Sequence, residues 1–217
     1  MYRIPRIDCN AACPASLEEA FARTARETIA CNNWPADFPC APQVGFRIFH
    51  TGSDLLLRFD VEERYTAART LDDNGPVWTD SCVEFFFRPE GSGCYYNFEC
   101  NCIGTLLVGH RQDRDHAEHA PAETLRTVRR RATYPHATLP ETEGDNRWTL
   151  TLVIPASALF RDRIVSWDGM KGAMNLYKCG DGLSQSHYLS WRPIETPKPD
   201  FHRPEYFEPV FFEPKKQ

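Results

Sequence analysis

Hydrophobic and polar residues alternate along residues 81–89 and again along residues 95–102. The apolar face of these two segments carries Val83, Phe85, Phe87, Tyr96, Phe98, Cys100 and Cys102. The opposite face carries the polar groups Glu84, Asn97, Glu99 and Asn101. A period of two residues is typical of strands that bury one face. The pattern therefore predicts two half-buried strands that are joined by the glycine-rich turn at residues 90–94.

The same period recurs elsewhere in the chain. Residues 44–50 and 55–62 flank a Thr-Gly-Ser-Asp turn and predict a second hairpin. Shorter strands are expected at residues 127–134, 147–154, 174–178 and 188–191. The chain also has 17 prolines and 12 glycines, which favour turns over long helices. We therefore expect an all-β fold, an antiparallel β-sandwich of the immunoglobulin-like kind with a short N-terminal helix.

The first 43 residues have a different pattern, which predicts this helix. Ser16 and Glu19 have the spacing of a capping box, with Ser16 as the N-cap. An apolar side follows, made of Leu17, Ala20, Phe21 and Ala25. We expect the helix to end near Ala30, where Asn and Pro residues follow. Residues 1–43 are thus predicted to form a helix and a connector that pack on the sandwich of residues 44–217, as one domain overall.

Composition narrows the class of protein. The chain has 217 residues, of which 41% are hydrophobic and 12% aromatic, enough for one core. A net charge of −5 gives no reason to expect a nucleic-acid partner. No apolar run is long enough to span a membrane, and the first ten residues do not read as a signal peptide. Nine cysteines leave at least one thiol unpaired, so we expect a cytoplasmic protein, or a secreted one if a signal peptide precedes this sequence.

The polar strand face is the main candidate for chemistry. Trp78 stands just before the first strand, so an indole lies beside a row of carboxylate and carboxamide groups. A sugar offers hydroxyls at its edge and C–H groups on its flat face, and such a surface suits both. Two further candidates are Arg58, on a non-core strand face, and Trp191, as a second wall. The predicted ligand-binding residues are Trp78, Glu84, Asn97, Glu99, Asn101, Trp191 and Arg58.

Two other kinds of site were weighed on the residues alone. Cys9 and Cys13, like Cys100 and Cys102, lack the spacing of paired zinc knuckles, and no metal site is predicted. Glu84 and Glu99 have the residue types of a glycoside hydrolase pair if their strands are neighbours. Hydrogen bonding to sugar hydroxyls explains both glutamates with fewer assumptions. We therefore favour binding, and catalytic residues are not assigned.

At these residues the chain resembles carbohydrate-binding family 9, which belongs to the wider DOMON-like group of β-sandwiches. The resemblance rests on W-x-D-x-x-V-E-F-F at residues 78–86 and Y-x-N-F-E-x-N-x-x-G at residues 95–104. The first hairpin and W-x-L-T-L-V-I-P at residues 148–155 support it. The order and spacing of these motifs are more specific than any one of them. Together they extend the resemblance over residues 44–212.

The resemblance implies a non-catalytic module, of a kind often attached to enzymes that degrade plant polysaccharides, with a saccharide or glycoside as ligand. Family members hold a terminal sugar between tryptophans, a role that it gives to Trp78 and Trp191, with Glu84 and Asn101 as hydrogen-bonding groups. Glu99 stands where some members have a basic residue, so their sugar preference is not carried over. Some members bind structural calcium, although no cofactor is predicted here.

Some DOMON-like relatives carry haem, which keeps a redox module open as an alternative. Its axial ligands would be drawn from Met170, Lys171, Met174 and Lys178.

Overall fold

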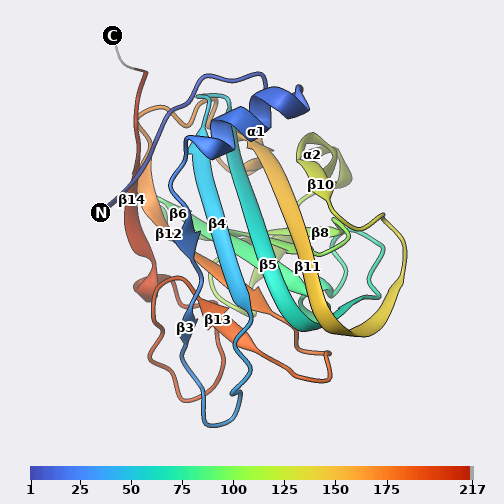
Figure 1. Cartoon of the computed structure of the whole chain (residues 1–217). Coiled ribbons are helices and arrows are strands. Elements are labelled where there is room, and N and C mark those ends of the chain that lie inside the picture. Colours follow the sequence, from blue (N-terminus) through green and yellow to red (C-terminus); the bar gives the residue numbers. More distant parts are fainter. Residues whose placement is uncertain (216–217) are drawn as a thin grey trace.

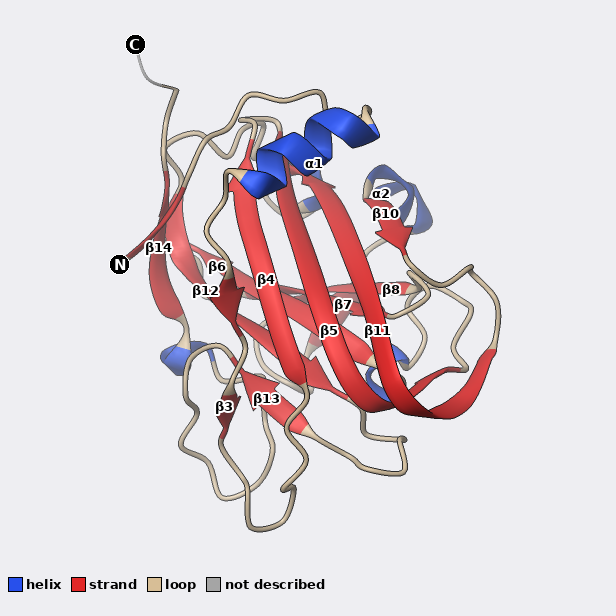
Figure 2. Cartoon of the chain, viewed as in Figure 1, coloured by secondary structure: helices blue, strands red, loops and turns tan. Residues whose placement is uncertain are grey.

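Within residues 1–215, the part of the chain that this computed structural model describes, fourteen strands form two sheets (Figures 1 and 2). The larger sheet has the order β1 (Tyr2–Ile4), β14 (Glu208–Phe212), β12 (Lys171–Cys179), β6 (Cys82–Pro89), β7 (Tyr95–Asn101), β8 (Leu106–Arg111) and β9 (Ala117–His119). Beside β12 it also includes β13 (Tyr188–Ser190) and then β3 (Cys31–Asn32). The smaller sheet has the order β10 (Arg129–Ala132), β11 (Leu139–Pro155), β5 (Asp54–Ala68), β4 (Gln43–His50) and β2 (Glu27–Thr28).

The two sheets pack face to face, and the predicted β-sandwich is confirmed. Their inner faces share one apolar cluster, to which β6 contributes Val83, Phe85 and Phe87. From the smaller sheet, Leu57 of β5 and Leu152 of β11 belong to the same cluster. The shared cluster follows from the alternation of apolar residues, because every second side chain of a strand points to the same side of the sheet.

Both hairpins predicted from the sequence are present. β6 pairs with β7 in antiparallel register, with Glu84 opposite Glu99 and Phe85 opposite Phe98. β4 pairs with β5 in the same manner. β6 and β7 are central strands of the larger sheet, since β12 and β8 flank them.

The outer face of β6 and β7 is covered as well, so the prediction of half-buried strands is wrong. Phe86, on the outer side, is buried in a second apolar cluster. Trp34 from the N-terminal segment and Phe201 and Phe207 from the C-terminal segment cover it. These irregular segments carry aromatic side chains but no strand period, and burial of those aromatics draws them onto the sheet.

Helix α1 (Pro14–Ala22) lies across the outer face of the smaller sheet, in dark blue in Figure 1. Leu17 and Phe21 pack there against Phe49 of β4. The predicted capping box is wrong: Cys13 is the N-cap, and Pro14 begins the helix because it needs no N–H partner there. Ser16 instead accepts a hydrogen bond from the Asn10 N–H.

The remaining N-terminal residues contribute strands rather than a longer helix and a plain connector. β1 pairs with β14, β2 with β4, and β3 with β13, so residues 1–43 join both sheets. The helix ends at Ala22 rather than near Ala30, because the chain then pairs with β4 through β2.

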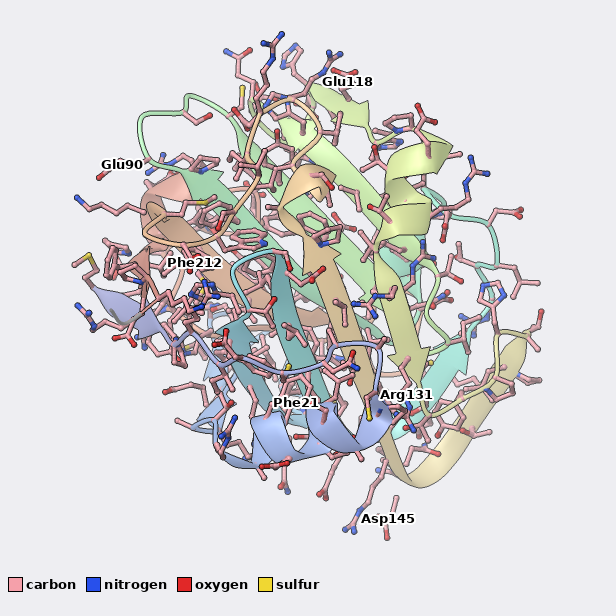
Figure 3. All side chains as sticks on the ribbon, turned by 90° about the horizontal axis from the view of Figure 1, so that it is seen from above. Phe21, Glu90, Glu118, Arg131, Asp145 and Phe212 are labelled. Carbon is pink, nitrogen blue, oxygen red and sulfur yellow. The ribbon has the colours of Figure 1, made fainter. Side chains whose placement is uncertain are left out.

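The other helices are short: α2 (Ala122–Thr127) and the 3-10 helices η1 (Val77–Thr79), η2 (Ala156–Ala158) and η3 (Pro204–Tyr206). Among residues 1–215, no helix has the length and apolar character needed to cross a bilayer. Figure 3 shows side chains filling the space between the layers, with the charged residues Glu90, Glu118, Arg131 and Asp145 at the periphery.

Candidate functional site

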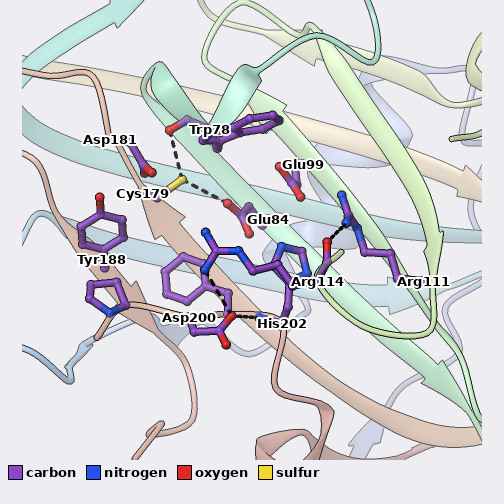
Figure 4. Close-up of a pocket in the computed structure, with 12 residues that line it drawn as sticks. Trp78, Glu84, Glu99, Arg111, Arg114, Cys179, Asp181, Tyr188, Asp200 and His202 are labelled. Atoms are coloured by element: carbon purple, nitrogen blue, oxygen red, sulfur yellow. Dashed lines mark hydrogen bonds and ion pairs between the residues drawn. The ribbon is translucent and has the colours of Figure 1, made fainter. Parts of the chain in front are cut away.

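A cavity of about 250 Å³ opens on the outer face of the larger sheet, beside the segments that cover it (Figure 4). Three adjacent strands provide its floor: β12, β6 and β7 contribute Cys179, Glu84 and Glu99. Trp78 of η1 and Tyr188 of β13 line it from the sides. The floor is thus rigid sheet, while the walls come from loops and short elements.

Glu84 and Glu99 form a buried carboxyl pair on this floor. They are register partners on neighbouring strands, and each is only 3% exposed. Burial raises the pKa of Glu84 well above its ordinary value, and the nearby charge of Glu99 raises it further. Burial also raises the pKa of Glu99, although a hydrogen bond from Asn97 opposes the shift. Because both shifts favour the protonated form, the pair can donate as well as accept hydrogen bonds.

Hydrogen bonds from neighbouring side chains hold both carboxyl groups in place. The Asn97 carboxamide donates to Oε1 of Glu99 at 2.6 Å. The Cys179 thiol donates to Oε1 of Glu84 at 3.0 Å. Arg111 donates from Nε to Oδ1 of Asn97 at 2.9 Å, so Arg111, Asn97 and Glu99 form one chain of hydrogen bonds.

Trp78 offers an exposed aromatic face to this polar floor. Its side chain is 39% exposed, whereas Trp34, Trp148, Trp167 and Trp191 are buried. Tyr188 and Asp181 also line the cavity, and burial raises the pKa of Asp181 to about 6. An indole beside hydrogen-bonding groups is the combination that binds a flat ring with polar edges.

Arg114, from the segment between β8 and β9, and residues 199–202 near the end of the chain also line the cavity. Arg114 lies 3.9 Å from Asp200, between Nη1 and Oδ1. Nδ1 of His202 and the Tyr95 hydroxyl form a hydrogen bond of 2.9 Å. Burial, helped by the charges of Arg111 and Arg114, lowers the pKa of His202 to about 3, so this imidazole is neutral at pH 7.

Of the seven residues predicted to bind ligand, the structure brings Trp78, Glu84 and Glu99 to the cavity. Asn97 lies behind them and supports Glu99. Asn101 donates to the carboxylate of Asp80 and to the carbonyl of Thr70, and so holds the loop that leads to Trp78.

Two of the predicted residues lie elsewhere. Trp191 is 4% exposed and packs edge-on against Tyr2 and Phe46 in the core between the sheets. Tyr188, three residues earlier, takes the wall position, because alternation along the strand turns Leu189 and Trp191 into the core and Tyr188 to the other side. Arg58 lies on the smaller sheet and pairs with Glu18 of α1, away from the cavity.

The residues that sequence reasoning missed come from two sources. Arg111 continues the alternation of β8, where Gly109 and Arg111 face the side of Asn97, and this register could have been extended from β7. Arg114, Asp181, Asp200 and His202 lie in irregular segments, for which the sequence gives no period to follow.

The residues present do not support calcium or haem at this site. Over the described residues, the one group of three acidic, cysteine or histidine side chains with mutually close ligand atoms is Cys82, Glu84 and Cys179. Calcium takes six to eight oxygen ligands, so a set with two sulfurs does not fit it.

The haem candidates are also apart from the cavity: Met174 is buried in the core between the sheets, and Lys178 is buried in an ion pair with Glu63 at 2.8 Å.

Comparisons with protein families and with solved structures agree on one family. The family model described as carbohydrate-binding family 9 matches residues 12–212. The crystal structure of a Bacteroides uniformis protein, provisionally described as carbohydrate-binding, has 39% sequence identity and a TM-score of 0.91, covering 97% of this chain and 98% of that one. No curated protein matches this chain.

Two more distant structures share the fold. They are complexes of a family 9 carbohydrate-binding module from Caldicellulosiruptor kristjanssonii, one with glucose and one with cellotriose. The glucose complex has a TM-score of 0.62 at 8% identity, covering 99% of this chain and 97% of that one. The cellotriose complex has a TM-score of 0.59 at 7% identity, covering 100% of this chain and 95% of that one.

Proposed function

Because this chain belongs to carbohydrate-binding family 9, we propose that it binds a saccharide without cleaving it, in the cavity above β6, β7 and β12. One observation carries the proposal: an exposed indole, Trp78, lies beside the buried carboxyl pair Glu84 and Glu99 in a single cavity. A volume of about 250 Å³ is below the range of about 300–1,000 Å³ that is usual for drug-sized ligands. One sugar unit, free or at the end of a chain, suits this size.

The chemistry of binding follows from the groups around the cavity. The C–H face of the sugar ring packs on Trp78, where apolar area leaves water. Its hydroxyls meet Glu84 and Glu99, which can both accept and donate, and Arg111, which only donates. A mixed set of this kind discriminates among sugars by the positions of their hydroxyls, since an unmatched buried polar group costs free energy.

The test is calorimetry with a panel of mono- and oligosaccharides. Glucose and cellotriose come first, since fold relatives bind them, followed by uronic acids and amino sugars. We expect Trp78→Ala to weaken binding by about tenfold or more, equivalent to about 1.4 kcal/mol of lost stacking. Val165→Ala, at an exposed apolar residue outside the cavity, is the control. The absence of binding by the wild-type protein across a broad glycan array would refute the proposal.

A second candidate function, glycoside hydrolysis, is favoured by the Glu84 and Glu99 pair alone. Directly opposite residues on antiparallel strands have Cβ atoms about 4.5–5.5 Å apart, so their side chains can bring the carboxyl groups to the separation of about 5–5.5 Å that retaining hydrolases use. Turnover of aryl glycosides by the wild-type protein, lost in Glu84→Gln, would establish it. Flat progress curves across an aryl glycoside panel would leave binding as the function of the pair.

A further inference from the structure

Cys82, Glu84 and Cys179 meet at the floor of the cavity, which Glu84 and Cys179 line, although Cys179 is far from the other two in the sequence. Cys82 of β6 and Cys179 of β12 are direct register partners. Glu84 follows Cys82 by two residues, so it projects from the same face of β6. The sheet register therefore places two thiols and one carboxyl group next to one another on the same face.

The three side chains lie close together. The Cys179 thiol lies 3.0 Å from Oε1 of Glu84. One ligand atom from each residue lies within 4.8 Å of the other two. Zinc binds thiolate sulfur at about 2.3 Å and carboxylate oxygen at about 2.0–2.2 Å, so small side-chain rotations would let all three share one ion.

We propose that Cys82, Glu84 and Cys179 bind a thiophilic divalent metal ion such as Zn²⁺, with its remaining coordination position open to the cavity. Two sulfur ligands and one oxygen ligand match the donor types that zinc selects. Glu84 and Cys179 line the cavity, which gives the ion an entry path and leaves one side of it for water or a ligand hydroxyl. The carbonyl oxygen of Trp78, 3.6 Å from the Cys179 sulfur, is a further oxygen at the same place.

Other buried cysteines in the chain lack these features. Cys100 and Cys102 are also buried, but they face the apolar core between the sheets rather than the cavity. They belong to no group of close ligand atoms among residues 1–215. Burial alone therefore does not bring potential metal-ligand atoms together. Cys82, Glu84 and Cys179 have this arrangement, at the cavity floor.

Binding has a definite proton balance. Metal ions bind thiolates and carboxylates, so each thiol, and Glu84 where it is protonated, must release its proton when the ion binds. One Zn²⁺ therefore displaces two or three protons, and no oxidant or reductant takes part. Glu84 is shared with the proposed sugar site, but metal binding does not require that a sugar be bound.

The experiment is a titration of reduced, chelator-treated protein with Cd²⁺, followed by competition with Zn²⁺, in the absence of sugar. Cd²⁺ reports thiolate ligation through its ultraviolet charge-transfer band. We expect one tight ion per chain, and an affinity that falls more than about 100-fold in Cys179→Ser and in Cys82→Ser, since even outer ligand partners are worth about 10–100-fold. Cys94→Ser, at a half-buried thiol in the turn before β7, is the matched control and should bind as the wild type does.

Two further measurements keep the proposal falsifiable if a serine variant folds poorly. Thermal unfolding of each variant in chelator shows whether the fold is intact without metal. X-ray absorption at the zinc edge of the wild-type protein should show two sulfur ligands with oxygen completing the shell. The absence of stoichiometric binding, or binding that both serine variants retain, would overturn the proposal. Recovery of Cys82 and Cys179 as a disulfide from freshly lysed cells would do so too.

Discussion

Gly109 lies on β8 directly opposite Asn97 of β7, and its missing side chain leaves the room that the Asn97 carboxamide occupies. A Cβ atom at this position would lie 2.4 Å from Oδ1 of Asn97 and 3.3 Å from Nε of Arg111. These two atoms form the hydrogen bond that joins Arg111 to the carboxyl pair through Asn97. The polar support of the cavity floor thus depends on a residue with no side chain.

We expect Gly109→Ala to lower stability by about 1–3 kcal/mol, the usual cost of an overpacked interior. Sugar affinity should fall as well, because Asn97 must turn away from Glu99 and Arg111. Denaturant unfolding and calorimetry measure the two effects. Gly93→Ala is the matched control, since a Cβ there meets nothing within 4 Å. Unchanged affinity in a folded Gly109→Ala protein would show that the Asn97 contact does not matter for binding.

At the residue scale, strand alternation was sufficient for two of the three floor residues of the cavity, Glu84 and Glu99, but not for Cys179 or for the walls. Glu84 and Glu99 follow from the period of two on β6 and β7, because the register of a hairpin places its faces together. Trp191 was assigned to a wall because it closes the predicted strand at residues 188–191 and because of the family resemblance. Alternation along β13 instead places Trp191 in the core with Leu189, and Tyr188 is the residue that reaches the cavity.

At the scale of the elements, α1 and the cavity lie on opposite outer faces of the sandwich. The helix packs on the outer face of the smaller sheet, whereas the cavity lies on the outer face of the larger one. The whole sandwich therefore separates Phe21 of α1 from Glu84 on the cavity floor.

We expect Phe21→Ala to destabilise the protein by about 3 kcal/mol, because it removes a buried ring that packs edge-on against Phe49. Sugar affinity of the folded fraction should stay at the wild-type value. Chemical denaturation and calorimetry below the unfolding transition test this separation. Glu19→Ala, at an exposed position of the same helix, should change neither quantity. A loss of affinity in folded Phe21→Ala would mean that the helix and the cavity are coupled.

The elements that escaped prediction are those whose pairing is short or whose backbone is irregular. β2 and β3 have two residues each, too few for a period to be visible. The covering segments that contain Trp34 and Phe201 are aromatic but not periodic, so the sequence could not place them over the outer face of β6 and β7. Their position explains why the floor residues are buried rather than exposed.

At the scale of the whole molecule, buried neutral histidines make stability depend on pH. Burial lowers the pKa of His50 to about 4, of His187 to about 3 and of His202 to about 3. In the unfolded chain these side chains take up protons below about pH 6.5, whereas in the folded protein they remain neutral. At these three residues the unfolded state then binds more protons, so their contribution to the free energy of unfolding falls as the pH is lowered. The raised pKa values of Glu84, Glu99 and Asp181 contribute with the opposite sign, because at these carboxyl groups the folded state binds more protons.

We expect the free energy of unfolding of the wild-type protein to fall relative to that of His50→Gln from pH 6.5 to pH 4, the window set by the ordinary histidine value and the lowered pKa of His50. Urea unfolding of both proteins across this window measures the difference. His50→Gln should reduce the slope by up to one proton in that window, because it removes one of the three groups. His116→Gln, at an exposed histidine whose pKa is raised by a hydrogen bond to Asp113, should not reduce the slope. The same pH dependence in the wild-type protein and in His50→Gln would contradict the assignment of a neutral His50.

The covered outer face of β6 and β7 also has a consequence for the order in which a newly made chain becomes functional. β6 and β7 are synthesised well before residues 199–202, which line the cavity, and before β14, which pairs with both β1 and β12. While the ribosome is still translating the C-terminal segment, Phe86 and Tyr95 lack the cover of Phe201 and Phe207. The nascent chain therefore carries an uncovered aromatic surface on the face of the sheet where the cavity later forms, the kind of surface that chaperones recognise. Premature termination before residue 199 would leave that surface uncovered for good.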